Sequence, residues 1–161
     1  MAHYGTPNDD RILVPTRNQY LDSTRNLQFE SYTCARTSVT PESWTNQEGV
    51  TTLGRILQSG EVLAKITTAA GTSTADDVDK VGPYQVGATD GRGDLANIVG
   101  VNETFVPWQL DERDVDIAAL WHGTVRFAWC TIRDAAGARI PMTTAVADAL
   151  YGKRSLDVNS K

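Results

Sequence analysis

The residues of this chain that could do chemistry are few and lie far apart in the sequence. The only imidazoles belong to His3 and His122, and the only thiols belong to Cys34 and Cys130. A zinc centre needs three or four such ligands, and those of structural sites come in closely spaced pairs. These four residues form no such pair, so the sequence predicts no metal centre of this kind.

Two acidic runs, at residues 112–116 and 76–79, could suggest a calcium loop. An EF-hand loop that began at Glu112 would need glycine at its sixth position and glutamate at its twelfth. The chain has Ile117 and Gly123 at those positions. We therefore interpret both runs as solvated loops or as strips of inter-subunit salt bridges, and we expect no bound metal.

Neither a catalytic nucleophile nor a dinucleotide-binding loop has the surroundings that its chemistry needs. Ser59 and Ser73 lie in turn or loop sequence without a nucleophile elbow, and His122 is the only base available in the domain. Residues 91–96 match the G-x-G-x-x-A pattern, which needs a strand before it and a helix after it. Here a turn precedes and a β-branched strand follows, and the same turn explains the Arg-Gly-Asp tripeptide at 92–94. We expect no enzyme and no cofactor.

Composition and charge disfavour several classes of partner. The 161 residues carry a formal net charge of −5, whereas a duplex-binding protein clusters Lys and Arg against phosphates. The same charge disfavours adhesion to an anionic membrane. No apolar run reaches the roughly 18 residues of a transmembrane helix, and the first residues do not form a signal peptide. We expect no nucleic-acid or membrane partner, and free thiols in a reducing cytoplasm.

Residues 1–49 differ in character from the rest of the chain. They are rich in Thr, Ser, Asn, Gln and Arg, and their apolar residues are mostly isolated, so little can be buried locally. We interpret this region as an extended arm that becomes ordered by pairing with a sheet edge. For residues 27–33, whose apolar residues alternate, an ordinary first strand of the same domain is the alternative. The candidate arm contacts are Ile12, Leu13, Val14, Leu27, Phe29 and Tyr32.

From residue 49 onward, short strand patterns alternate with turns. A hairpin turn is predicted at Ser59-Gly60, and a turn at Asp90-Gly91 in which glycine takes a positive φ. Residues 116–127 have the pattern of two strands that turn near His122-Gly123. The other strand candidates are residues 55–58, 61–67 and 95–101, with a short extended piece from Pro83. Residues 69–79 are predicted to form a surface loop, and residues 102–116 a long excursion between strands.

One helix is predicted near the carboxyl end, over residues 141–151. The proline at its start suits a first turn, because its missing N–H would be unpaired there. Val146 and Leu150 share one face, and Gly152 suits a left-handed cap that ends the helix. The tail after Ser155 is polar and is interpreted as loose or bound to a partner.

Four tryptophans stand out in a chain with 7% aromatic residues. Trp121 and Trp129 lie inside strand patterns and are predicted to be buried in the core. Trp108 follows a proline in a loop, and Trp44 lies in the arm, where burial within one subunit is harder. Large aromatic residues also anchor interfaces, so Trp44 and Trp108 are candidate inter-subunit contacts.

Four short motifs follow one another between residues 53 and 100: Leu-Gly-Arg at 53–55, Gly-Pro-Tyr at 82–84, Ala-Thr-Asp-Gly at 88–91 and Ile-Val-Gly at 98–100. Their order resembles that of the head decoration proteins of lambda-type phages. The resemblance covers about residues 50–130. Each motif is a turn or strand sequence, so the order of the motifs carries the resemblance.

The resemblance implies a β-rich α+β fold: a compact mixed β domain at residues 50–161 with one short carboxy-terminal helix, preceded by a capsid-binding arm at residues 1–49. It implies homotrimers seated on the major capsid protein at threefold and quasi-threefold sites of the mature phage head. There, on the outer surface of the virion, they would stabilise the shell against internal DNA pressure. The longer arm and the excursion at 102–116 depart from the family, and one of them is expected to reach a neighbouring trimer or capsomer.

Two other classes of function stay open. A small β-rich module that binds carbohydrate or another ligand would use Trp44 and Trp108 as stacking platforms. A small hydrolase or nucleotide enzyme built around His122 is the third class, and the shortage of His, Cys and paired carboxylates disfavours it.

Overall fold

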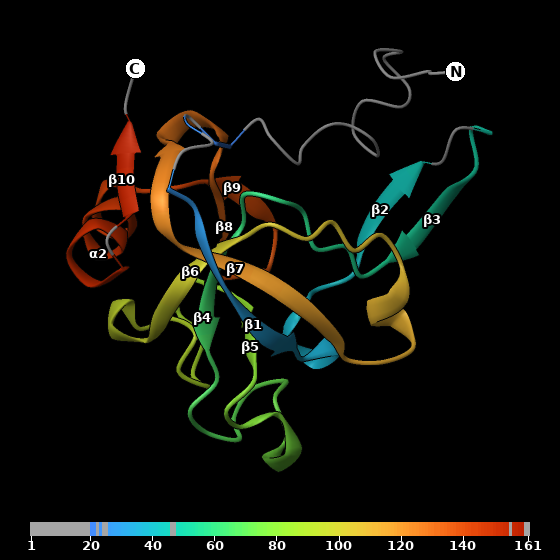
Figure 1. Ribbon diagram of the computed structural model, residues 1–161. Helices are drawn as coiled ribbons and strands as arrows, with labels where there is room; N and C mark the ends of the chain where they lie inside the picture. The colour runs from blue at the N-terminus through green and yellow to red at the C-terminus, as the bar shows by residue number, and fades with distance from the viewer. Residues whose placement is uncertain (1–19, 22, 24–25, 46–47, 155, 160–161) are drawn as a thin grey trace.

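The computed structural model describes residues 20–159 except residues 22, 24–25, 46–47 and 155. The described part is β-rich with one short α-helix near its carboxyl end, which confirms the predicted fold class (Figure 1). Five 3-10 turns connect the strands: η1 (Arg36–Ser38), η2 (Ala75–Asp77), η3 (Leu95–Asn97), η4 (Gln109–Asp111) and η5 (Phe127–Trp129). The helix and strands are β1 (Gln28–Cys34), β2 (Glu42–Thr45), β3 (Thr51–Gly54), β4 (Val62–Lys65), β5 (Val81–Pro83), β6 (Ile98–Asn102), β7 (Val115–Arg126), β8 (Thr131–Arg133), β9 (Arg139–Pro141), α2 (Thr144–Arg154) and β10 (Leu156–Asn159).

Five strands form a closed ring. Their order is β1-β5-β4-β6-β7, and β1 pairs in turn with β7 over its whole length, so the first and last strands of the series meet. β10 adds to the second half of β7 in parallel. Two small sheets, β2-β3 and β8-β9, lie outside the ring.

Each side of the ring strands contacts a different core. One core fills the ring and takes residues from all five of its strands. The other lies on the outer face of β4, β6 and β7, under α2, β8 and β10. In β4, Leu63 contacts the first core, whereas Val62 and Ala64 contact the second, because successive side chains of a strand point to opposite faces. This double burial explains why the segment reads as an unbroken apolar run.

β7 is one strand, so the prediction of two strands turning near His122-Gly123 is wrong. The register against β1 shifts at this point, with Phe29 opposite Leu120 and Gln28 opposite His122. β7 therefore carries one extra residue, a bulge that bends a strand without ending it. Gly123 has a φ of 150°, and a Cβ there would lie 2.8 Å from the Leu27 side chain. The glycine thus serves close packing inside the strand, not a turn.

Part of the predicted arm belongs to the domain. β1 is a ring strand, its residue Cys34 is fully buried, and Val39 beyond it lies in the same core. For residues 27–33 the structure therefore has the ordinary first strand, and the domain begins well before residue 50. Residues 1–19 lie outside the described residues, so an arm in that region stays a prediction.

Further boundaries differ from their predictions. Pro141 ends β9, and α2 begins at Thr144 and continues through Gly152, so neither predicted helix signal marks a boundary. The tail forms β10 in place of a loose end, because Gly123 and the next three residues of β7 offer it an edge. Gly60, by contrast, has the positive φ of a turn, as does Gly91. The predictions of a strand at residues 55–58 and of a hairpin at Ser59-Gly60 are wrong, because Leu57 makes only an isolated bridge to Val106 and does not pair with β4.

A buried cluster of charges joins β4 to β8, β9 and β2. Glu61, fully buried, lies 2.7 Å from Nε of Arg133, which is itself 2% exposed. Arg139 donates to both carboxylate oxygens of Glu42 at 2.9 and 2.6 Å. Burial alone would raise the pKa of Glu61, but the guanidinium groups of Arg139 and Arg133 outweigh it and lower this pKa. The carboxylate is therefore ionised at neutral pH.

We expect Glu61→Gln to lower the free energy of unfolding by about 3–5 kcal/mol at pH 7, because it removes the fully buried carboxylate nearest to Arg133 and leaves Glu42 as the one counter-charge that the described residues give to two buried guanidinium groups. Urea unfolding measures the loss. The matched control is Asp79→Asn at the exposed pair with Lys65 (2.8 Å), which should cost less than about 1 kcal/mol. Equal losses in the two variants would contradict the structural role of Glu61.

The contribution of Glu61 to stability depends on pH. The pKa of Glu61 is lowered in the folded state. Its contribution is therefore present above the pKa of the unfolded state and is lost as the pH falls through the pKa of the folded state.

Candidate interaction surfaces

The predicted arm contacts differ in how far they are buried in the domain. Ile12, Leu13 and Val14 lie outside the described residues. Leu27 is half-buried against the core under α2, and Tyr32 packs on the ring core while its hydroxyl donates to Glu30 at 2.6 Å. Phe29 is 43% exposed, so of the three described candidates it has the side chain most accessible to a partner.

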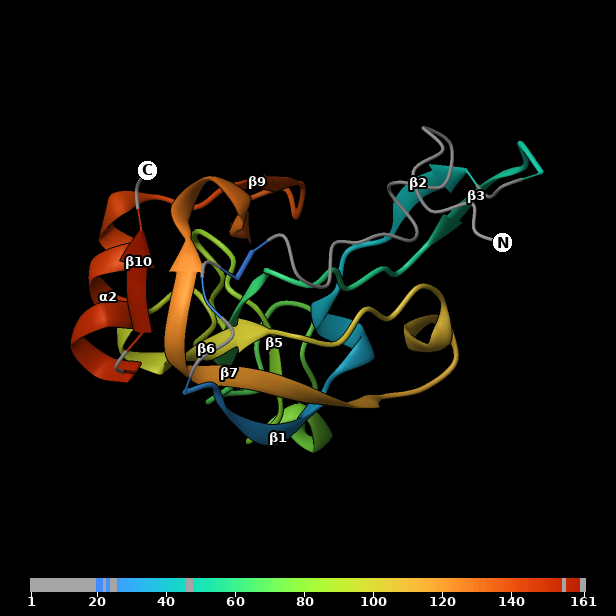
Figure 2. The same ribbon diagram turned by 45° about the horizontal axis from the view of Figure 1, so that its top comes forward.

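The β2-β3 hairpin projects from the body of the protein, as Figure 2 shows. Its strands pair with each other from Glu42 opposite Gly54 to Thr45 opposite Thr51, and with no other described strand. Two of its apolar side chains face solvent, with Leu53 at 70% and Val50 at 51% exposure. A two-stranded hairpin is marginally stable by itself, and this one buries little of its apolar surface.

Polar contacts hold the hairpin at its base. Arg139 binds Glu42 at the start of β2. At the end of β3, Asp111 of η4 accepts a hydrogen bond of 2.9 Å from the Arg55 backbone N–H. A Cβ at Gly54 would lie 2.8 Å from Oδ2 of Asp111 and 3.4 Å from Nε1 of Trp44. The excursion at 102–116 and the hairpin therefore meet here.

This contact brings the two predicted interface tryptophans to neighbouring segments. Trp44 is half-buried on β2, close to Gly54. Trp108 directly precedes η4 and is 56% exposed. Together with the exposed side chains of the hairpin, they define what we call the hairpin surface: Trp44, Val50, Leu53 and Trp108. This surface includes both faces of the hairpin, because Trp44 pairs with Thr52 whereas Leu53 pairs with Ser43, one position along.

The other two tryptophans are less buried than predicted. Trp129 lies in η5 and is 51% exposed. Trp121 is half-buried, and its ring centroid lies 5.8 Å from that of His122. The bulge in β7 explains Trp121, because it turns one residue of an apolar run out of the core. The assignment of both residues to the core is therefore wrong.

The sequence reasoning also missed Val50, Leu53 and Tyr151 as exposed apolar residues. Leu53 was part of a motif assigned to a strand, and its exposure depends on the hairpin lying away from the ring. Tyr151 was assigned to the predicted helix but not to the apolar face of that helix. The helical pattern alone would have placed Tyr151 on the solvent-facing side of the helix, away from Val146 and Leu150.

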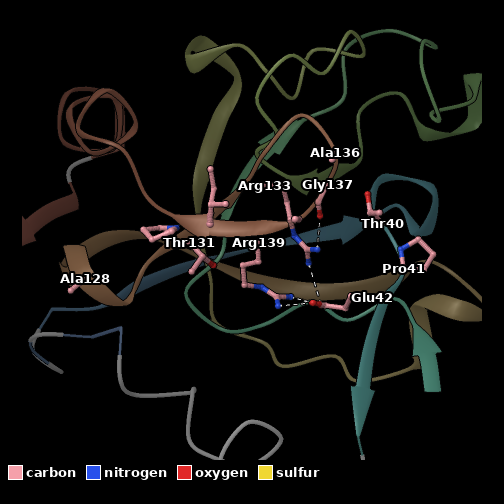
Figure 3. Close-up of a pocket in the computed structure, with 12 residues that line it drawn as sticks. Thr40, Pro41, Glu42, Ala128, Thr131, Arg133, Ala136, Gly137 and Arg139 are labelled. Atoms are coloured by element: carbon pink, nitrogen blue, oxygen red, sulfur yellow. Dashed lines mark hydrogen bonds and ion pairs between the residues drawn. The ribbon is translucent and has the colours of Figure 1, made fainter. Parts of the chain in front are cut away.

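A cleft of about 540 Å³ lies beside β8 and β9 (Figure 3). Its charged lining consists of Glu42, Arg133 and Arg139, which bind one another or Glu61. Arg133 also donates to the Gly137 and Ile56 carbonyls at 3.0 and 2.9 Å. Because these charged groups pair with one another, we interpret them as stabilising the fold and not as ligand-binding groups of the cleft.

The turn at Asp90-Gly91 is fixed by a second buried ion pair. Arg92 is 3% exposed and donates to Asp90 at 2.8 Å, to the Ser38 carbonyl at 3.0 Å and to the Pro83 carbonyl at 3.1 Å. Ser73 donates to the same carboxylate at 2.6 Å. The Arg-Gly-Asp tripeptide thus has its arginine inside the protein, where no adhesion receptor could reach it.

The two acidic runs are connected to each other by Lys80. Its ammonium lies 2.6 Å from Asp114 and 3.4 Å from Asp77. Burial would raise the pKa of Asp77, but hydrogen bonds from Thr74 and Thr37 outweigh it, and the pKa is lowered. Within the described residues, no group of three or more His, Cys, Asp and Glu side chains could hold a metal ion.

No helix in the described part of the chain is both long and apolar enough to cross a membrane. No protein-family model matches the chain, and no curated protein matches it either.

Cys34 and Cys130 are free thiols, and both are fully buried. Burial raises the pKa of each to about 12, so almost no reactive thiolate exists at neutral pH. We expect neither cysteine to react with a thiol-specific colorimetric reagent at pH 8 in the folded protein, and both to react in urea. Prompt reaction without urea would mean that the cores open on the timescale of the assay.

Proposed function

We propose that the chain is a structural decoration protein of a phage head, which binds the major capsid protein as a homotrimer on the outer surface of the virion. The hairpin surface carries the proposal: it offers exposed apolar side chains on a projecting element that is held at its base by polar contacts. The order of the sequence motifs supports it independently. A β-rich domain that joins subunits needs adhesive edges and surfaces, not a reaction centre.

The hairpin surface suits contact with a neighbouring subunit of the shell or of the trimer. Isolated exposed apolar residues are common in proteins, but here several gather on two segments that meet at Gly54. Aromatic and aliphatic side chains that are desolvated at the centre of an interface supply most of its binding energy. In this proposal Trp108 and Leu53 are such anchors.

Cement action follows from linkage. A protein that binds only the mature arrangement of neighbouring capsid subunits stabilises that arrangement by mass action. Addition of a strand from the region before β1 would supply main-chain hydrogen bonds with little demand on sequence. Many copies on one shell then act together. Ile12, Leu13 and Val14 are the residues of that region with the side chains for such a strand.

Residues 1–19 can be tested without removing β1. The full-length protein and a variant lacking these residues are sedimented with mature phage heads stripped of decoration protein, at one salt concentration. We expect saturable binding by the full-length protein and at least tenfold weaker binding by the variant, with circular dichroism unchanged. Deletion of residues 1–49 would not serve, because it removes a ring strand. Equal binding by both proteins would contradict the role of the arm, and no binding by either would contradict the function.

The hairpin surface has its own test. We expect Leu53→Asp to weaken association with the shell or between subunits by about tenfold or more, since a charge would then replace an interface anchor. Co-sedimentation with phage heads measures association with the shell, and sedimentation velocity measures association between subunits. Val86→Asp is the matched control, because Val86 is also exposed (44%) but lies outside the hairpin. Both changes should alter stability by less than about 0.5 kcal/mol. Equal effects of the two variants on binding would reject the hairpin as the contact.

A ligand-binding module is favoured less. Trp44 and Phe105 line a cleft of only about 140 Å³, below the roughly 300–1,000 Å³ of typical ligand sites. Trp108 is not among its lining residues. Saturable quenching of tryptophan fluorescence by a sugar would nevertheless support that class.

A further inference from the structure

A second apolar surface lies at the end of the protein opposite the hairpin, between α2 and β10 (Figures 1 and 2). It is a cleft of about 480 Å³. Its apolar lining includes Phe127, Tyr151 and Val158, and Tyr151 is 68% exposed. Two exposed acidic residues, Asp148 and Asp157, also line it. The cleft therefore combines an apolar lining with negative charge.

One edge of β10 adjoins this cleft and has no partner among the described strands. β10 is the last strand in the order of the six-stranded sheet, and within the described part of the chain it pairs only with β7. Asp157 and Val158 of this strand line the cleft. A strand added to this edge would therefore place its side chains at the cleft.

The hairpin offers a strand of the same length for this edge. β3 and β10 each have four residues, and β3 pairs with β2 and with no other described strand. A two-stranded hairpin gains stability when a further strand joins it. The hairpin and β10 lie at opposite ends of one molecule (Figures 1 and 2). Pairing of β3 with β10 therefore requires two copies of the chain.

One face of the hairpin has the shape to fill an apolar cleft. Leu53 is 70% exposed and lies opposite Ser43, while Thr51 lies opposite Thr45 on the same face. The neighbours of Leu53 on this face are thus short polar side chains. Leu53 is the large apolar side chain of the face, and it can enter a cleft that its neighbours only border. Trp44 lies on the opposite face and takes no part in this contact.

The charge beside Leu53 is opposite to the charge of the cleft. Arg55 follows β3 two residues after Leu53, and its side chain is 28% exposed. Its Nη1 lies 3.7 Å from Oδ1 of Asp111, which is too far for a hydrogen bond. The guanidinium group therefore keeps donors for carboxylates such as those of Asp148 and Asp157. This complementarity specifies which end of one copy meets which end of the next.

We propose that the hairpin of one copy docks on the α2–β10 cleft of a second copy. In this contact β3 pairs with the free edge of β10, Leu53 enters the cleft, and Arg55 faces its carboxylates. The two surfaces differ, so the contact is head to tail and three such contacts can close a ring. The inference rests on the proposed function, because it assigns the contact between subunits of the homotrimer.

Cross-linking between two single-cysteine variants tests the contact. Thr51→Cys, on the face of Leu53, is mixed with Thr144→Cys, which lines the cleft; both positions are exposed. A short bis-maleimide is added to the free mixture at high micromolar concentration and to the mixture bound to stripped phage heads. The native cysteines are buried and do not compete. We expect products that join the two variants in at least tenfold excess over products that join two copies of one variant.

The control mixture contains Val86→Cys and Thr144→Cys, because Val86 is exposed but lies outside the hairpin. A predominance of products within one variant, or mixed products no more abundant than in the control in both samples, would overturn the inference. Co-sedimentation of the same proteins with the heads is scored separately and decides the proposed function. If they do not bind the heads, the free sample alone decides the inference.

Charge exchange tests the recognition. R55E in both cysteine variants should lower the yield of the mixed product on the order of fivefold, because attraction to Asp148 and Asp157 becomes repulsion. Adding D148R/D157R to the same chains should restore the yield, which a general loss of stability would not allow. An unchanged yield in R55E, or a failure of restoration with the fold intact by circular dichroism, would overturn the inference.

Discussion

The fold depends on the pairing of β7 along both of its edges. Through its first half β7 pairs with β1 on one edge and β6 on the other, which closes the ring. Through its second half it pairs with β10. Ile117 and Ala119 line the ring, and Leu120, on the other side of the strand, belongs to the core under α2. The bulge near Trp121 then reverses the alternation, so Val125 also belongs to the core under α2. One strand thus joins two cores, and a register slip in it would disrupt both.

The hairpin is attached by charge and polar contacts, with little apolar burial. Its carboxylate Glu42 is held by Arg139, and Arg139 lies against the buried Glu61 that also binds Arg133. Such a cluster fixes direction, because guanidinium groups accept only particular geometries around a carboxylate. The Leu53 side chain stays 70% exposed. A surface that is oriented before binding loses less conformational entropy when a partner arrives.

Local patterns predicted the parts of the fold that local chemistry determines. The strand at residues 61–67 was predicted and contains β4, and the turn at Gly91 was predicted with the positive φ that it has. Pairings between distant residues were not visible. For the first strand the sequence left two interpretations, and partners such as Leu120 opposite Phe29 decide between them. β10 depends in the same way on its pairing with residues 123–126 of β7. The exposure of Leu53 likewise follows from where the hairpin points, which no periodicity encodes. Trp108 is 56% exposed, and its role as an inter-subunit contact stays a prediction.

The distribution of apolar surface bears on how copies of the chain could associate. A twofold dimer uses one self-complementary patch, whereas a threefold ring requires two different patches that fit each other head to tail. Here Leu53 and Trp108 lie on the hairpin surface, and Tyr151 lies on α2 at the other end of the molecule. Two unlike apolar ends favour head-to-tail association over a twofold dimer.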